Sequence, residues 1–236
     1  MFGTFGIQGH RPMLKWLRLT TTALAVGGCS GPLSTLDTAG SAAASIATLW
    51  WAMLAGAAIL TVLVMTLLAL AFRRRPTPAP GGTRLWIGGL GVAMPSTVLL
   101  VLLGFALALG EQTIARKAAG VVVVEASAHQ WYWDFRHPGM AGEIVTRDVL
   151  HIPAGRPVDL RLEAHDVIHS FWVPRLAGKM DAIPGHVNVI RIDAKEPGRF
   201  EGQCAEFCGL GHAGHRFRVV AHDAAGWTAF QRGEQP

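Results

Sequence analysis

The chain has 236 residues, of which 50% are hydrophobic and only 16% charged, and its formal net charge is +5 at pH 7. Residues 1–110 hold seven basic residues and one acid, whereas residues 111–236 hold fourteen basic and fifteen acidic residues. The basic balance therefore belongs to the apolar N-terminal half and does not indicate a nucleic-acid partner. Three cysteines are too few for a disulfide scaffold.

The N-terminal 28 residues predict an export signal, because basic residues precede a short run of small apolar ones. The stretch Val26-Gly27-Gly28-Cys29 resembles a bacterial lipobox, so we expect lipidation of Cys29 at the head of a linker over residues 29–44. The alternative is an unmodified cysteine after a signal peptide or a weak membrane segment. One acyl chain binds a membrane only marginally, so the lipid would supplement the segments that follow.

Two uncharged apolar runs, residues 45–72 and 85–110, each exceed the roughly 20 residues needed to cross a bilayer. Two buried core helices of a soluble protein are the alternative, which two such lengths without a charge disfavour. Four arginines lie in the connecting turn, and the positive-inside rule puts that turn in the cytoplasm. The sequence therefore predicts a transmembrane hairpin in the bacterial cytoplasmic membrane. Its C-terminal domain, residues 111–236, is then exported to the periplasm or the outside.

The exported half has the pattern of an all-β domain. Alternating or β-branched runs predict strands at 121–126, 130–135, 148–152, 158–164 and 187–192. Turn-forming residues separate them at 137–139, 153–155, 184–185 and 197–198. Many short strands at this spacing predict an antiparallel sandwich or barrel. We expect the histidines in these turns and strands to lie at the surface: His137, His151, His186 and His222.

A metal-binding loop is predicted near the C-terminus, in Cys204-Ala-Glu-Phe-Cys208-Gly-Leu-Gly-His212-Ala-Gly-His215. Thiolate and imidazole together suit copper or zinc, and the glycines let the backbone curl so that the donors face one point. Closing such a site needs another imidazole from a distant loop. The candidates are His165 and His169.

Four motifs together resemble subunit II of the haem-copper cytochrome c oxidases: His129-Gln-Trp-Tyr-Trp133, His169-Ser-Phe-Trp-Val-Pro174, residues 178–185, and Cys204-x3-Cys208-x3-His212. The resemblance implies a Greek-key cupredoxin-like sandwich with a binuclear copper centre, Cu-A. It also implies that this subunit accepts electrons from cytochrome c and passes them to haem in subunit I, where oxygen is reduced. No haem-ligating histidine lies in either apolar run, so this chain holds no oxygen-reducing site.

The resemblance assigns two bridging thiolates, two capping imidazoles and one weak backbone ligand for two copper ions: Cys204, Cys208, His169, His212 and the carbonyl of Glu206. It further implies that the side chain of Glu206 contributes to a magnesium site at the boundary with subunit I. Trp131 matches the aromatic residue that receives the electron from cytochrome c. On a strand, Trp131 and Trp133 would share one face.

One position departs from the family pattern, because His215 stands where an axial methionine is expected. His215 either ligates copper, stays unbound and leaves a weaker site, or marks an altered centre; we favour ligation. Imidazole is a harder donor than thioether, so ligation predicts a lower redox potential, with pH sensitivity from titration of His215. The other interpretations are a zinc site, an oxidised cysteine pair, a quinol oxidase subunit II and a membrane-tethered copper-binding or copper-delivery protein.

Carboxylates of the exported half are candidates for steering a basic cytochrome, although each alone is more simply a surface charge. They are Asp134, Glu143, Asp148, Asp159, Asp166 and Asp181. The pair His165-Asp166 either orients His169 through a hydrogen bond or lies free on a loop.

Overall fold

The computed structural model describes residues 30–73, 82, 84–113, 115 and 120–234, so the predicted export signal and Cys29 lie outside the described residues. The helices are α2 (Ser41–Arg73), the π-helical η1 (Arg84–Ala93), α3 (Met94–Thr113), the 3-10 turn η2 (His212–Gly214) and α4 (Ala224–Gln231). The strands are β1 (Val122–His129), β2 (Tyr132–Pro138), β3 (Glu143–Arg147), β4 (Val149–Pro153), β5 (Val158–Ala164), β6 (His169–Trp172), β7 (Lys179–Ala182), β8 (Asn188–Ile192), β9 (Gly198–Cys204) and β10 (Arg216–His222).

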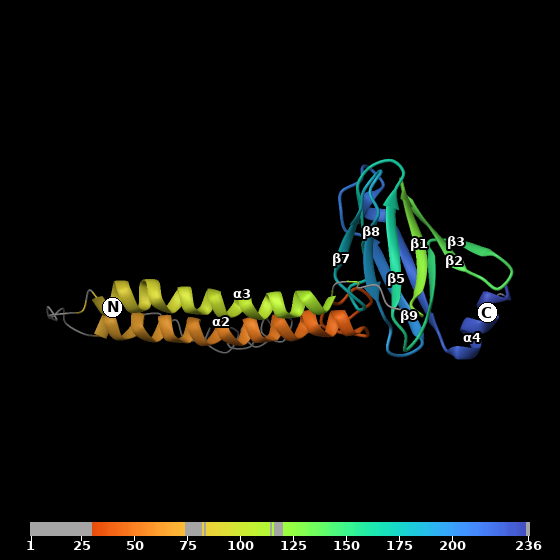
Figure 1. The fold of residues 1–236 in the computed structure, drawn as a ribbon. Coiled ribbons are helices and arrows are strands. Elements are labelled where there is room, and N and C mark those ends of the chain that lie inside the picture. Colours follow the sequence, from red (N-terminus) through yellow and green to blue (C-terminus); the bar gives the residue numbers. More distant parts are fainter. Residues whose placement is uncertain (1–29, 74–81, 83, 114, 116–119, 235–236) are drawn as a thin grey trace, which may run out of the picture.

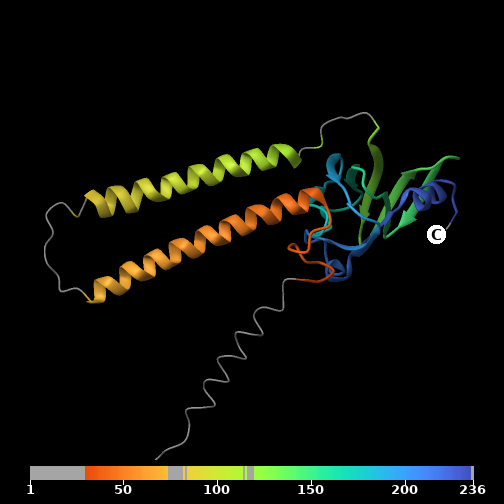
Figure 2. The same ribbon diagram turned by 90° about the horizontal axis from the view of Figure 1, so that it is seen from below.

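The two long apolar helices are confirmed. The spans Ser41–Arg73 and Arg84–Glu111 have mean hydropathies of 2.5 and 2.3 in their most apolar windows, which contain no buried residue. They run alongside each other and leave the β-domain on the same side (Figures 1 and 2). The π-helical segment η1 ends just before Pro95, whose missing N–H interrupts the ordinary i→i−4 ladder. Length and apolar surface fit a membrane protein.

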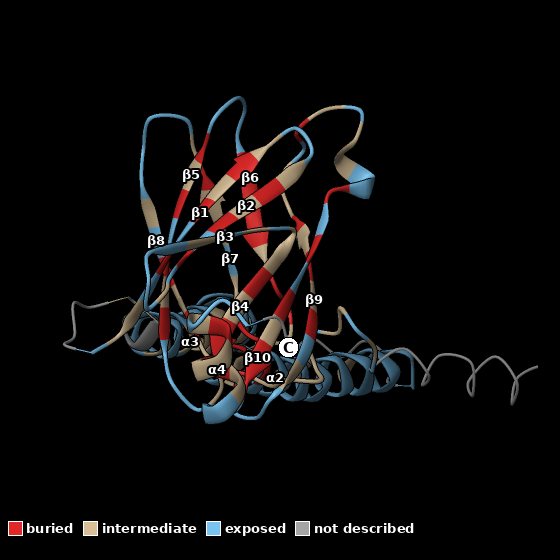
Figure 3. Ribbon diagram, turned by 90° about the vertical axis from the view of Figure 1, so that its right-hand side faces the viewer, coloured by how far each residue is buried: buried red, intermediate tan, exposed pale blue. Residues whose placement is uncertain are grey.

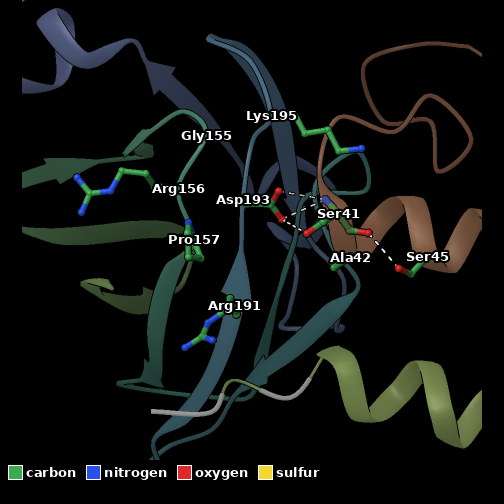
Figure 4. A pocket seen from close by; sticks show the side chains of 9 residues that line it. All are labelled: Ser41, Ala42, Ser45, Gly155, Arg156, Pro157, Arg191, Asp193 and Lys195. Carbon is green, nitrogen blue, oxygen red and sulfur yellow. Dashed lines mark hydrogen bonds between the residues drawn. The ribbon is translucent and has the colours of Figure 1, made fainter. Parts of the chain in front are cut away.

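Helix α2 is joined directly to the β-domain. It begins four residues earlier than predicted, and its first residue, Ser41, donates its backbone N–H to Asp193 Oδ1 at 3.0 Å (Figure 4). This carboxylate caps the helix. A Cβ on Gly40 would lie 2.3 Å from the carbonyl oxygen of Leu176, so only glycine permits this approach. The N–H of Ala43 also donates to that carbonyl, at 3.2 Å. A pocket of about 520 Å³ opens beside the junction.

The β-domain is the predicted sandwich, built from two five-stranded sheets. The strand orders are β3-β2-β1-β5-β8 and β4-β10-β9-β6-β7. Strand β1 pairs with β5 in parallel and β10 pairs with β4 in parallel, while every other pairing is antiparallel. The predicted antiparallel sandwich is therefore confirmed except for one parallel ladder in each sheet. The strands run across the direction of the two long helices (Figure 1).

The core between the sheets is rich in aromatic rings. Trp133 and Phe135 alternate inward from β2 and meet Phe171 of β6 and Phe217 of β10, all of them buried. The ring centroids of Phe171 and Phe217 lie 4.7 Å apart, and Trp133 meets Phe171 edge-on at 5.8 Å. Buried residues alternate with exposed or half-buried ones along strands such as β2 and β5 (Figure 3). Offset and edge-on contacts of this kind add to the apolar burial that holds two sheets together.

The prediction that four histidines lie at the surface was wrong for three of them. His137 and His222 are buried and His151 is half-buried, whereas His186 is exposed. His137 lies within β2 and continues the inward alternation of Trp133 and Phe135, so the turn predicted at 137–139 starts after Pro138. Its Nε2 accepts the backbone N–H of His151 at 3.0 Å, and the rings of His151 and His222 share a 2.8 Å hydrogen bond. The ring of His137 is hydrogen-bonded to the backbone and those of His151 and His222 to each other, so their burial leaves these ring nitrogens with polar partners.

Candidate metal centre

The predicted metal loop connects β9 to β10 at one end of the sandwich. Cys204 is the last residue of β9, and its N–H donates to the carbonyl of His215 at 2.9 Å, which closes the loop on itself. The next N–H, from Ala205, donates to the carbonyl of Ser170 in β6 at 2.9 Å. Gly209 has φ +114°, a conformation that favours glycine. The loop is therefore fixed at both ends and bent at its middle.

Four buried side chains bring metal-binding atoms together at this end of the sandwich. One donor atom from each lies within 4.8 Å of all the others: His169, Cys204, Cys208 and His215. The two sulfur atoms are 3.9 Å apart. His169 Nδ1 lies 3.9 Å from Cys204 Sγ, and His215 Nδ1 lies 3.7 Å from Cys208 Sγ. The distant imidazole that the loop needed thus comes from His169 and not from His165, which stacks on His129.

Further donors approach the same two sulfur atoms. His212 Nδ1 lies 3.5 Å from Cys208 Sγ, and the carbonyl oxygen of Glu206 lies 3.2 Å from Cys204 Sγ. His212 is not one of the four mutually close residues. By distance, His169 and the Glu206 carbonyl lie beside Cys204, whereas His212 and His215 lie beside Cys208.

A carboxylate orients His169. Asp166 Oδ1 lies 2.7 Å from His169 Nε2, which leaves Nδ1 facing Cys204. The backbone N–H groups of Val167 and Gln130 donate to the same carboxylate at 2.7 Å each. The hydrogen bonds from His169 and these N–H groups outweigh the desolvation of Asp166 and lower the pKa of its carboxyl. Of the two alternatives that the sequence left open for Asp166, the geometry favours a hydrogen bond that orients His169.

His215 is held as a neutral ring. It is 1% exposed, stacks on Trp133 at 5.7 Å between centroids and meets His169 edge-on at 5.1 Å. Burial, and secondly the neighbouring His169, lower the pKa of His215 to about 4. A neutral imidazole has a free lone pair, which a metal ligand requires. The titration of His215 that we expected to give pH sensitivity therefore lies at acid pH.

The chemistry of the cysteine pair fits a bound cation. Burial, followed by the adjacent Cys204, raises the pKa of the Cys208 thiol to about 12. Both cysteines are free thiols in this fold. A thiolate pair at this position therefore requires compensating positive charge, and soft sulfur donors with imidazoles suit copper.

Trp131 does not lie where the strand prediction put it. Residues 130–131 form the turn between β1 and β2, so Trp131 and Trp133 do not share a strand face. Trp133 is fully buried, whereas Trp131 is 41% exposed beside the metal loop. Its indole Nε1–H donates to the carbonyl of Cys208 at 3.2 Å, and Gln130 Nε2 donates to the same oxygen at 2.7 Å. Gln130 was not predicted as a site residue, because its only signal in the sequence was its place beside Trp131.

Five of the six carboxylates that were candidates for steering a basic cytochrome form an ion pair or a hydrogen bond within the chain. Asp134 pairs with Arg147 at 3.0 Å and Asp159 with Arg191 at 2.6 Å. The others contact a backbone N–H, Lys179 or His169, respectively: Asp148, Asp181 and Asp166. Ion pairs with Arg147, Arg191 and Lys179 thus offset three of the six carboxylate charges that were available to attract a basic partner.

A two-sheet sandwich with buried thiols and imidazoles converging at one end is a metal-binding domain of the cupredoxin-like class, and its donors fit a Cu-A copper site. Residues 137–221 match the family model described as the periplasmic domain of cytochrome c oxidase subunit II. The match covers most of the sandwich, so this part of the chain is similar to a subunit II periplasmic domain.

Curated relatives support the identification as a subunit II. Cytochrome c oxidase subunit 2 of Alkalihalophilus pseudofirmus is 41% identical over 112 residues, which are 48% of this chain and 32% of that protein. The alternative cytochrome c oxidase subunit 2 of Bradyrhizobium diazoefficiens is 32% identical over 140 residues, 48% of this chain and 50% of that protein. The chain thus spans half or less of the length of these two relatives.

Among solved structures, the periplasmic domain of subunit II of cytochrome oxidase (CoxB) of Bradyrhizobium japonicum is similar to this chain. It is 25% identical, with a TM-score of 0.47, and the similarity covers 51% of this chain and 96% of that domain.

Proposed function

We propose that this chain is the electron-accepting subunit of a haem-copper cytochrome c oxidase. In this proposal it takes electrons from cytochrome c and delivers them to haem in subunit I, and it assembles with the other oxidase subunits. The observation that carries the proposal is the convergence of His169, Cys204, Cys208 and His215 within 4.8 Å. The subunit II match over residues 137–221 supports it.

The proposed site holds two copper ions. Cys204 and Cys208 would supply the shared thiolate ligands, and His169, His212, His215 and the carbonyl of Glu206 would supply the remaining donors. When bound, the copper pair would store and release one electron at a time. The chain's own contribution is rigidity, since the loop is closed by backbone hydrogen bonds and His169 is oriented by a carboxylate.

The proposal extends to the ends of the chain. Residues 1–28 are a signal peptide, Cys29 is lipidated and residues 29–44 are its linker. Residues 45–110 cross the membrane twice, and residues 111–236 form the exported copper domain. The carboxylate of Glu206, which pairs with Lys179 at 3.2 Å, also contributes to a magnesium site at the boundary with subunit I.

The test is spectroscopic and kinetic. The purified oxidase that contains this chain should give a mixed-valence, seven-line copper EPR spectrum and should be reduced by reduced cytochrome c. A four-line spectrum would indicate a mononuclear copper centre, and zinc without copper would indicate a structural site; either result refutes the proposal. Reduction by quinol but not by cytochrome c would favour a quinol oxidase. Copper release to an acceptor protein, without reduction by cytochrome c, would favour copper delivery.

A further inference from the structure

The indole of Trp131 lies against the backbone of the metal loop. A Cβ placed on Gly211 would come within 2.3 Å of Trp131 Cδ2 and 2.6 Å of Cε3, closer than real contacts allow. A Cβ on Gly209 would lie 3.2 Å from Trp131 Cζ2. The backbone of Gly209 and Gly211 therefore forms a flat surface against which the ring packs, and we call this surface the seat of Trp131.

The backbone at Gly211 does not itself require glycine. Its φ of −85° and ψ of 1° are accessible to other residues. Gly209 differs, because its φ of +114° would strain any other residue. The space taken by Trp131 is thus the feature that excludes a side chain at position 211.

Hydrogen bonds hold the turn that carries Trp131 from two sides of the metal centre. Trp131 Nε1–H and Gln130 Nε2 both donate to the carbonyl of Cys208, at 3.2 and 2.7 Å. On the other side, the N–H of Gln130 donates to Asp166 Oδ2 at 2.7 Å, and Asp166 Oδ1 contacts His169. The indole is linked to the Cys208 sulfur by one hydrogen bond and a short run of covalent bonds.

We propose that Gly211 and Gln130 are positioning residues for electron uptake, because they fix the indole of Trp131 against the carbonyl of Cys208. Electron transfer is fastest along short covalent and hydrogen-bonded paths, so lifting the ring off this seat lengthens the path without altering a copper donor. This inference rests on the proposed function. It adds to it the residues that set the rate of electron uptake.

Gly211→Ala tests the seat, and Gly214→Ala is its matched control. Both make the same substitution in the same loop, but a Cβ at position 214 meets nothing within 4 Å. In the oxidase complex, rapid mixing with reduced cytochrome c measures electron uptake, while EPR and redox titration report on the copper centre. We expect uptake to slow at least tenfold in Gly211→Ala, with the seven-line spectrum and midpoint potential retained. Gly214→Ala should keep the parent rate.

A double variant separates the seat from other effects of Gly211. If Gly211 acts through Trp131, then adding Gly211→Ala to Trp131→Ala should slow uptake less than twofold further. Gln130→Ala, which removes the second donor to Cys208, should slow uptake severalfold with the spectrum unchanged. A rate in Gly211→Ala within twofold of the Gly214→Ala control would overturn the inference. Loss of the copper spectrum in Gly211→Ala would also overturn it, because the glycine would then shape the copper loop itself.

Hydrogen–deuterium exchange of the copper-free full chain gives a readout independent of activity. The N–H of Gln130 is held by Asp166, so a displaced turn should exchange faster in Gly211→Ala and normally in Gly214→Ala. Equal exchange in the two variants would contradict the seat. An unsubstituted oxidase without a Cu-A spectrum would instead refute the proposed function, and the exchange experiment would still decide whether Gly211 seats Trp131.

Discussion

Replacing His215 by methionine tests whether the unusual histidine binds copper. Its Nδ1 lies 3.7 Å from Cys208 Sγ in a fully buried position, where a metal bound to the thiolates is within reach. Methionine is unbranched and adaptable, so it can occupy this space. The substitution removes the stacking of His215 on Trp133, a loss of about 0.5–1.5 kcal/mol, and the fold should survive.

The expected effect is a rise in midpoint potential. Imidazole is the harder donor and favours Cu(II), whereas thioether favours Cu(I). If the exchange changes the relative affinity for the two oxidation states by about ten- to a hundredfold, the potential rises by about 60–120 mV, since tenfold is about 59 mV for one electron. The pKa of His215 is about 4 because of burial, so the ring stays neutral and the difference should be constant from pH 6 to pH 8.

Redox titration of the copper absorption bands measures this shift in the purified complex. His186→Met is the control, because it makes the same change at an exposed histidine outside the donor cluster. Equal potentials in His215→Met and the parent, with both EPR spectra intact, would show that His215 is not a ligand.

Three other predictions concern orientation, packing and pH. Asp166→Asn removes the carboxylate that orients His169 and should weaken copper binding about 10–100-fold in competition titrations; unchanged affinity would argue against that role. Phe171→Ala removes one fully buried ring from the aromatic core and should lower the free energy of unfolding in urea by about 3–5 kcal/mol. A decrease below about 1 kcal/mol would mean that the core repacks. The pKa values of His137 and His151 are lowered by burial to about 4, so the unfolded chain binds more protons between pH 6.5 and 4. The free energy of unfolding should therefore decrease as the pH is lowered from 6.5 to 4, by about 3 kcal/mol for His137. Urea midpoints that do not change over this pH range would contradict this.

The features that the sequence predicted well are those encoded by local spacing. Two uncharged runs are sufficient to identify long apolar helices, whatever they pack against. The close spacing of Cys204, Cys208 and His212 predicts a donor loop because nearby residues on a glycine-rich turn must lie close together. Five strands with clear alternation were predicted within a few residues of their observed ends.

The features that were missed depend on partners distant in the chain. Trp131 and Trp133 alternate like strand residues, but the turn at 130–131 is fixed by hydrogen bonds to Cys208 and Asp166, which local spacing does not reveal. Asp159 is neutralised by Arg191, 32 residues away in β8. Burial of a polar residue depends on whether a partner satisfies it, and register across sheets decides that.

The junction between α2 and the sandwich has a mechanical consequence. Gly40, which packs against Leu176, and Asp193, which caps Ser41, attach the first turn of α2 to the sandwich. No linker separates the helix from the sandwich at this junction. The sandwich and α2 would then tilt together as one rigid unit. Because a membrane-spanning helix tilts to match the thickness of the hydrocarbon layer, a thinner or thicker bilayer around α2 would then reorient the metal loop and the exposed indole of Trp131.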